Sequence, residues 1–343
     1  MSCESKSATY DRLQRYLTQR SSPTLTTLPD GSIDRYCTLS AGAMGPLETR
    51  ETLGREIHDT NRSTFRMRVN ATEPGGQAVN VAQQLDSLGC EVTCYGHLDA
   101  PIFDTLSFET ISMGEPASVY AFNFTDGDVM FVEESGVTDW TLKDLQQVAE
   151  LSSVFSVDAV CCSNWVSFPA MDSAFRQLST KDLPRVPFIL DPGDIVGSTL
   201  EELQSLQQAL SALQETFDVI YNANKQEIRA TAATLSDPPE NDLEKLAAIR
   251  STIDISAVVM HAPDRAAVAT GDNIISVQNL TIDQPQRYTG GGDRFTGGIG
   301  YGIACEWEWP LALACGNACA ARYIQTGATG TIDDIIDFVD RHI

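Results

Sequence analysis

The sequence predicts an α/β protein with a mostly parallel sheet and a smaller strand-rich part. After Trp140 the pattern alternates between helical and strand-like segments, which is typical of βαβ units in a parallel sheet. Before Glu134, short strands and turns dominate. The 343 residues, 42% of them hydrophobic, suffice for one large α/β domain with a small appendage.

Residues 1–24 are expected to form an N-terminal extension, and residues 25–343 the main domain. The extension has a short amphipathic stretch followed by a Ser/Thr/Pro segment, and neither contains a recognisable catalytic or binding motif. The first residues lack the apolar core of a signal peptide, and the chain has no run of eighteen apolar residues. We therefore expect a cytoplasmic protein with no membrane partner.

The strand-rich part contains a hairpin and one helix. Residues 118–124 alternate in polarity, Thr125 to Asp128 provide a turn, and residues 129–133 form the returning strand. Alternation also favours a strand at 64–69. The helix has an apolar stripe between Ala78 and Leu88 and is expected to end at Gly89.

The second half predicts successive strands of the large sheet. Apolar runs at 157–162, 188–190, 219–221 and 257–260 alternate with helical segments, the first of which opens with a Thr141/Asp144 capping box. Ligands of parallel sheets lie at the carboxyl ends of the strands. That rule places Asp191, Asn224 and the residues after Met260 on the ligand edge.

The composition is strongly acidic. The chain has 47 acidic and 23 basic residues, a net charge of −24, and five of the basic residues are lysines. Such a surface disfavours nucleic acid as a partner. It favours adaptation to high salt, where ions screen self-repulsion, over a merely acidic protein. Melting with and without molar KCl tests this hypothesis, which unchanged stability would contradict.

The nine cysteines and four histidines show no metal-binding pattern. No Cys-x-x-Cys or His-x-x-x-His spacing is present, and most cysteines lie among apolar neighbours. We expect buried thiols that act as small hydrophobic side chains.

Residues 289–298, Thr-Gly-Gly-Gly-Asp-Arg-Phe-Thr-Gly-Gly, are the most informative segment. Gly290, Gly291 and Gly292 precede a helical pattern, so their bare amides and the helix dipole predict an anion site. Asp293 would be repelled by a bound phosphate unless it has a chemical role. We interpret it as a base that deprotonates a hydroxyl beside a phosphoryl group. Ordinary capping by an acidic residue in the first turn is the alternative.

Three further polar clusters are expected near this segment. One is the acidic turn from Asp30 to Asp34. Another is Gly75-Gly76 with Asn80 at the start of a helix, where glycines allow close approach and Asn80 can bind hydroxyl groups. In the third, Asn224 and Glu227 share one helical turn and suit Mg²⁺ and its water ligands.

These motifs together resemble the ribokinase-like (PfkB) family of sugar and nucleoside kinases. The segment from Gly75 to Gly89 is similar to the amino-terminal signature of that family, and 289–298 to its carboxy-terminal signature. Asn224-x-x-Glu227 resembles the Asn-x-x-Glu motif of the family, and the three occur in family order over about residues 28–328.

The resemblance implies a three-layer α/β/α domain with a small β lid at about 35–70 and 115–134. It implies ATP- and Mg²⁺-dependent phosphorylation of a primary alcohol of a sugar or nucleoside. The implied roles are a base (Asp293), an anion hole (Gly290, Gly291, Gly292), substrate contacts (Asp34, Gly75, Gly76, Asn80, Asn164), Mg²⁺ and phosphate contacts (Asn224, Glu227) and an adenine contact (Asn317).

Two departures from the family pattern affect the cofactor site. Arg287 stands where the family has an aspartate that commonly helps to bind a monovalent cation, and Tyr288 replaces the usual threonine. We hypothesise that the Arg287 guanidinium replaces that cation; a side chain pointing into solvent is the alternative. His261-Ala262-Pro263 replaces a Thr-x-Gly loop that contacts the nucleotide in relatives, so ADP or another nucleotide is conceivable as donor.

Other functions fit the chain less well. No Gly-x-Gly-x-x-Gly follows an early strand, and no Gly-Lys pair exists, so a dinucleotide-binding dehydrogenase and a P-loop enzyme are disfavoured. A nucleoside kinase and a non-catalytic sugar or nucleotide sensor remain as alternatives. Open lid edges favour a homodimer through the lid.

Overall fold

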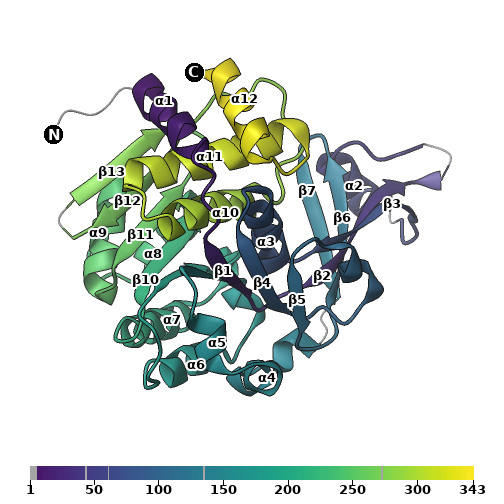
Figure 1. Cartoon of the computed structure of the whole chain (residues 1–343). Coiled ribbons are helices and arrows are strands. Elements are labelled where there is room, and N and C mark those ends of the chain that lie inside the picture. Colours follow the sequence, from purple (N-terminus) through teal and green to yellow (C-terminus); the bar gives the residue numbers. More distant parts are fainter. Residues whose placement is uncertain (1–5, 43–44, 61, 134–135, 272) are drawn as a thin grey trace.

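The computed structural model describes residues 6–42, 45–60, 62–133, 136–271 and 273–343 (Figure 1). Nine strands form one sheet in the order β13-β12-β11-β10-β9-β8-β1-β4-β5, and four form a second sheet in the order β3-β2-β6-β7. The strands of the large sheet are β1 (Thr24–Leu28), β4 (Glu91–Gly96), β5 (Glu109–Ser112), β8 (Ala159–Ser163), β9 (Pro187–Asp191), β10 (Asp218–Asn224), β11 (Ala257–His261), β12 (Arg265–Thr270) and β13 (Asn273–Gln278).

The large sheet is mostly parallel, as predicted. All neighbours from β5 to β11 run parallel, and β12 and β13 add two antiparallel strands at one edge. Consecutive residues of the central strands face opposite cores: Cys161 packs in one apolar cluster and Cys162 in the other. Burial on both faces explains why these strands are continuous apolar runs.

Helices cover both faces of this sheet and confirm the three layers (Figure 1). One layer contains α1 (Lys6–Leu17), α3 (Gln77–Ser87), α10 (Gly291–Ala304), α11 (Trp309–Thr326) and α12 (Ile332–His342). The opposite layer contains α4 (Leu142–Val148), α5 (Leu151–Phe155), α6 (Met171–Leu178), α7 (Leu200–Leu213), α8 (Lys225–Ala232) and α9 (Asp242–Ile253).

The small sheet forms the lid beside the large domain (Figure 1). Its strands are β2 (Ser32–Ser40), β3 (Arg66–Gly75), β6 (Ala117–Phe124) and β7 (Gly127–Glu133), with α2 (Arg50–His58) nearby. The predicted hairpin is the β6–β7 pair. Cys37, Leu47, Phe122 and Phe124 form a small separate core. At its inner end, Ser32 pairs with Gly75, so the lid strands lead directly into the cluster around Asp34 and Gly76.

The amino-terminal segment contributes a core helix. Tyr10, Leu13 and Leu17 of α1 are fully buried in the cluster that contains α11 and α12. The eight described cysteines carry free thiols, and all except Cys305 are buried, as expected from their apolar neighbours. Within the described ranges, no helix is both long and apolar enough to cross a bilayer.

Candidate active site

The amino terminus of α10 is formed by the three glycines. Gly290 is the N-cap residue and has φ +89°, a conformation that favours glycine. A Cβ at Gly290 would lie 3.1 Å from the Tyr323 hydroxyl, and one at Gly292 would lie 3.3 Å from Cε1 of His261. The neighbouring side chains therefore leave little room for anything larger than glycine at this helix start.

Several amides at this helix start are open. Gly291 donates its amide to the carbonyl of Tyr288 over 3.1 Å. Within the described part of the chain, the amides of Gly290, Gly292 and Asp293 donate no hydrogen bond. Open amides at the positive end of a helix dipole provide an anion-binding surface without any cationic side chain.

Asp293 occupies the third helical position and turns toward α3. Its carboxylate accepts hydrogen bonds from Nδ2 of Asn80 over 2.8 Å and from Nε2 of Gln77 over 3.4 Å. It makes no side-chain cap of α10. Asp293 is thus an acidic residue in the first turn of α10, as the alternative expected, but its hydrogen bonds go to α3 and not to its own helix.

Asp293 lies in a strongly negative, buried environment. The residue is 7% exposed, and Asp30, Asp191 and Glu227 are also buried. Burial raises the pKa of Asp293 to about 7, and the charge of Asp191 acts in the same direction, whereas Arg294 and Asn80 oppose the shift. A carboxyl group with this pKa can take up a proton near neutral pH, which is the property of a general base.

Asp30 fixes the start of α3, a role that the sequence analysis missed. Its carboxylate accepts from the amides of Gln77 over 2.8 Å and Ala78 over 2.7 Å. Asn164, predicted as a substrate contact, donates Nδ2 to Asp30 over 3.1 Å and has a left-handed backbone with φ +61°. Asn164 therefore connects the end of β8 to the turn that supports α3.

Asp34 and the glycine pair lie together at the lid end. Asp34 accepts from the hydroxyl of Ser32 over 2.6 Å. A Cβ at Gly75 would lie 2.2 Å from Cγ of Asp34, and one at Gly76 would lie 2.8 Å from Cα of Gly31. Both glycines are thus required by close approach.

Asn224 and Glu227 form a reciprocal capping box at the start of α8. Asn224 is the N-cap, and its Oδ1 accepts from the amides of Gln226 over 2.8 Å and Glu227 over 3.0 Å. Glu227 accepts from the Asn224 amide over 2.7 Å, and the two side chains also contact each other. The sequence correctly placed the pair on one turn but did not predict the mutual hydrogen bonds.

The chemistry of this pair fits Mg²⁺ held through water. Burial raises the pKa of Glu227 to about 8, and the charges of Asp191, Asp194 and Asp293 add to the shift. A divalent cation would relieve this repulsion. Among the described residues, no group of three or more His, Cys, Asp or Glu could hold a metal. The pair therefore suits Mg²⁺ that keeps most of its ligands as water and phosphate oxygens.

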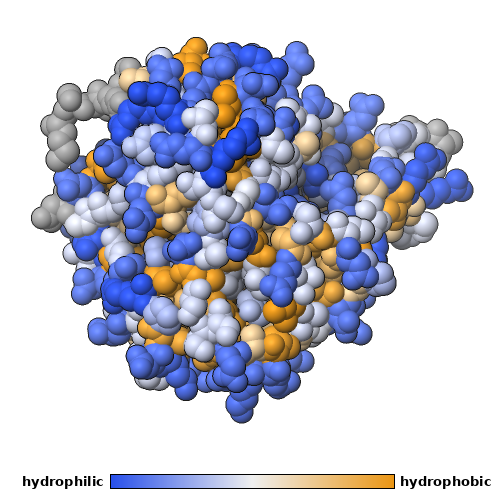
Figure 2. Space-filling model, in the orientation of Figure 1, coloured by the Kyte–Doolittle hydropathy of each residue, from blue (hydrophilic) through white to orange (hydrophobic). Residues whose placement is uncertain are grey.

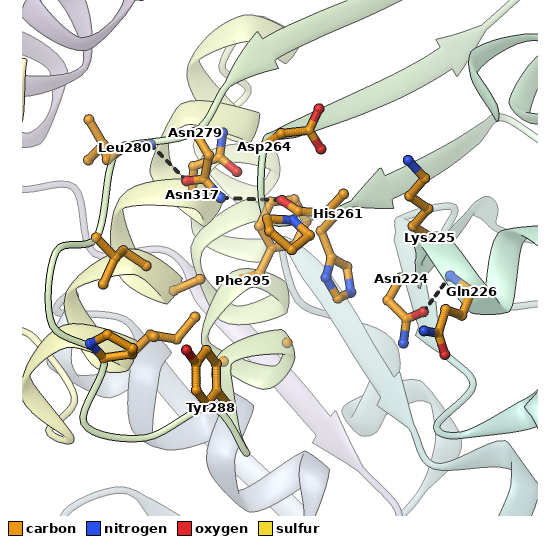
Figure 3. A pocket seen from close by; sticks show the side chains of 18 of the residues that line it. Asn224, Lys225, Gln226, His261, Asp264, Asn279, Leu280, Tyr288, Phe295 and Asn317 are labelled. Atoms are coloured by element: carbon orange, nitrogen blue, oxygen red, sulfur yellow. Dashed lines mark hydrogen bonds between the residues drawn. The ribbon is translucent and has the colours of Figure 1, made fainter. Parts of the chain in front are cut away.

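A cavity of about 880 Å³ opens beside the glycines (Figure 3). This volume lies within the usual range for small-molecule sites. At one end are Asn224 and Lys225, and at the other are Asn279, Leu280 and Asn317 (Figure 3). His261 lies between Phe295 and Asn224, 4.9 Å from the Phe295 ring centre, and burial lowers its pKa to about 4 (Figure 3).

Asn317 and Arg287 occupy different environments. Asn317 is 1% exposed on α11 and lines the cavity at the end remote from Asn224. Arg287 contacts the lid: Nη1 is 3.4 Å from Oε2 of Glu73, and the guanidinium is 4.3 Å from the centre of the Tyr36 ring. Its side chain is only 19% exposed, so the alternative that it points into solvent is wrong.

Asp191 and Gln77 lie close to Asp293 and were given no role by the sequence. Asp191 ends β9 and accepts from the Thr296 hydroxyl over 2.9 Å and from the Gly193 amide over 3.3 Å. Burial raises its pKa to about 6, with a further contribution from Asp30. The rule that ligands lie at the carboxyl ends of parallel strands did place Asp191 at this edge. Its hydrogen bond with Thr296 of α10 joins segments that are far apart in the sequence, so no local pattern predicts it.

The sequence profile of the prokaryotic ketohexokinase family matches residues 43–342. The chain belongs to this family. Ketohexokinase of Haloferax volcanii is 24% identical over 351 residues, covering 97% of this chain and 89% of that protein. The family assignment makes this protein a carbohydrate kinase, with an alcohol group as phosphoryl acceptor.

Solved structures share the ribokinase-like fold with this carbohydrate kinase. Ribokinase of Thermotoga maritima superimposes with a TM-score of 0.65 at 11% identity, covering 92% of this chain and 98% of that chain. A nucleoside kinase of Methanocaldococcus jannaschii gives 0.63 at 13% identity, with 94% and 100% covered. At these identities the likeness shows the fold alone.

Proposed function

We propose that this kinase transfers the γ-phosphoryl group of ATP to a primary hydroxyl of a ketohexose, with Asp293 as general base. The observation that carries the proposal is a buried carboxylate beside open helix-terminal amides, next to a large cavity. The name of the Haloferax relative supports the sugar class.

Each of the site residues has a separate role in phosphoryl transfer. The sugar hydroxyl gives its proton to the Asp293 carboxylate as its oxygen attacks the γ-phosphorus, and the bond to the β-phosphate oxygen breaks to leave ADP. The open amides of Gly290, Gly292 and Asp293 stabilise negative charge on the transferred group, whereas the Gly291 amide, expected to do the same, is already bound to the Tyr288 carbonyl. Asn80 orients the base over 2.8 Å, and Asp34 and Gly76 lie where sugar hydroxyls would bind.

Mg²⁺ would be held near Asn224 and Glu227 through water, where it would neutralise phosphate charge. Asn317, at the far end of the cavity, would contact the adenine. The first assignment is supported by the negative charge gathered around Glu227, and the second by the position of Asn317 at the cavity wall.

A substrate panel tests the proposal. Ketohexoses, aldohexoses, sugar phosphates, sugar acids and nucleosides are assayed for ADP release with Mg·ATP at high salt, and GTP and ADP are compared as donors. We expect the highest kcat/KM with a ketohexose and ATP. Preference for a nucleoside would support the nucleoside kinase alternative and would contradict the proposal.

The turnover number kcat should decrease at acidic pH. Only the ionised Asp293 can accept the hydroxyl proton, and its pKa is raised to about 7 by burial and by Asp191. As pH falls below this value the protonated fraction grows, so kcat should fall about tenfold per pH unit. A pH profile of kcat at saturating substrate concentrations measures this decrease on the acidic side. A flat profile down to pH 5 would contradict the assignment of the base.

Activity should not require potassium specifically. The Arg287 guanidinium, packed against Tyr36 and Glu73, stands where the resemblance places a cation-binding aspartate. Its fixed positive charge would replace the monovalent cation. We expect equal turnover in sodium and potassium at constant ionic strength. A large specific requirement for potassium would show that Arg287 does not have this role.

The lid supports a homodimer. Met67 and Val69 on β3 and Met130, Phe131 and Val132 on β7 are between 43% and 58% exposed. Both strands are edges of the lid sheet, and Figure 2 shows apolar residues among polar ones on this projecting part. Pairing of two lids would cover these edges. Sedimentation at high salt measures the mass, and a monomer at micromolar concentration would contradict this proposal.

A further inference from the structure

A cluster of positive side chains borders the cavity beside Asn224. Lys225 and Arg229 of α8 both line it. Both bind one carboxylate, Asp242: Nζ of Lys225 lies 3.2 Å from Oδ2, and Nη2 of Arg229 lies 2.8 Å from the same oxygen. A third cation, Lys245, contacts Oδ1 over 3.3 Å. Three cations on one carboxylate leave the cluster with an excess of positive charge.

Asp242 is held in its ionised form and fixes these side chains. Hydrogen bonds from Arg229, followed by those from Lys225 and Lys245, hold the pKa of Asp242 well below its usual range. Arg229 binds it through two nitrogens, Nε over 2.9 Å and Nη2 over 2.8 Å. This fork geometry fixes the orientation of the guanidinium, and Arg229 lines the cavity in that position.

The cluster is unusual for this protein. The whole chain has five lysines and a net charge of −24, yet two of these lysines bind Asp242. The side chains of Lys225 and Arg229 remain 40% and 55% exposed, so they can reach an incoming ligand. Asp264, an acidic residue at the same end of the cavity, is paired with Arg265 over 2.8 Å (Figure 3).

We propose that Lys225 and Arg229 bind the phosphate groups of the nucleotide donor, with Asp242 as the residue that positions them. This inference rests on the proposed kinase function and assigns its donor contacts. The open amides of α10 lie at one helix start, beside Asp293. A polyphosphate carries several further negative charges, which a protein of net charge −24 would otherwise repel. Lys225 and Arg229 supply that missing countercharge on the wall of the same cavity that Gly291 and Gly292 line.

Equilibrium binding of ATP, ADP and adenosine to the full-length protein tests this proposal by calorimetry at one constant salt concentration at which wild type and variants are folded. Lys225→Ala and Arg229→Ala should each weaken ATP and ADP binding by roughly tenfold or more, the usual loss for a charge-assisted hydrogen bond. Adenosine affinity should stay unchanged, because adenosine carries no phosphate. Lys225→Arg keeps the charge and should restore most of the ATP affinity.

Lys245→Ala is the matched control. Lys245 binds the same carboxylate but does not line the cavity, so its loss should leave ATP affinity unchanged. Equal ATP affinity in wild type, Lys225→Ala and Arg229→Ala would overturn the inference while leaving the kinase function in place. An equal loss for ATP and adenosine would also overturn it, because a structural defect would then explain the result. Failure of the wild-type protein to bind ATP would instead refute the proposed function itself.

Discussion

Replacing Asp293 with asparagine is expected to lower kcat by a factor of about 10² to 10⁴, the usual contribution of a general base. Asparagine has nearly the same shape as aspartate, and its one oxygen can still accept from Asn80, whereas the longer hydrogen bond from Gln77 would be lost. It cannot accept the hydroxyl proton while the phosphoryl group is transferred. Steady-state kinetics with saturating sugar and Mg·ATP measures the loss.

The variant should fold and bind ATP normally. The substitution removes a buried carboxylate whose pKa is already raised to about 7, so no stabilising charge is lost. Asp254→Asn is the matched control: this residue ends α9 with φ +58°, a conformation that asparagine also adopts, and it should keep full activity. Wild-type kcat in Asp293→Asn would refute the assigned base and the mechanism built on it.

Replacing Gly298 with valine is expected to destabilise the protein by about 3 kcal/mol, at the upper end for overpacking. A Cβ at Gly298 would lie 2.7 Å from Cα of Gly316 and 2.9 Å from the carbonyl oxygen of Cys315. Both atoms belong to the backbone of α11, which cannot turn aside as a side chain can. The two helices would have to separate, which would also displace the amino terminus of α10.

Denaturant unfolding measures this loss, and Gly298→Ala should give a smaller loss in the same direction. Gly54→Ala is the matched control, because Gly54 lies in α2 and, among the described residues, no heavy atom lies within 4 Å of its added Cβ. It should be neutral or slightly stabilising, since glycine weakens a helix interior. Equal stability of Gly298→Val and wild type would show that α10 and α11 pack less closely than described.

Local pattern was sufficient for most of the fold. The apolar runs became strands because a sheet covered on both faces needs apolar residues throughout, as Cys161 and Cys162 show. The stripe from Ala78 to Leu88 became α3, and the Thr141/Asp144 capping box begins α4. These signals depend on neighbours within a few positions, so the sequence displays them directly.

The candidate site was predicted as separate pieces. Asn80 and Asp293 are 213 positions apart, and nothing in either motif indicates that one donates to the other. The hydrogen bonds that Asp30 accepts from the start of α3 and that Asp191 accepts from Thr296 were missed for the same reason. Asp242 was missed because an acidic residue at a helix start is an ordinary sequence feature until its three cationic partners are known.

The sequence by itself determined the β6–β7 hairpin, α3, the alternation of helices and strands after Trp140, the glycine collar at Gly290, Gly291 and Gly292, and the kinase class that these motifs resemble. Tertiary structure alone decided that Asp293 turns to Asn80 and does not cap its own helix, and that Arg287 packs against the lid. The physical reason is that periodicity and capping act within a turn or two of chain. Burial, like-charge repulsion and hydrogen bonding between distant strands exist only after the chain has packed.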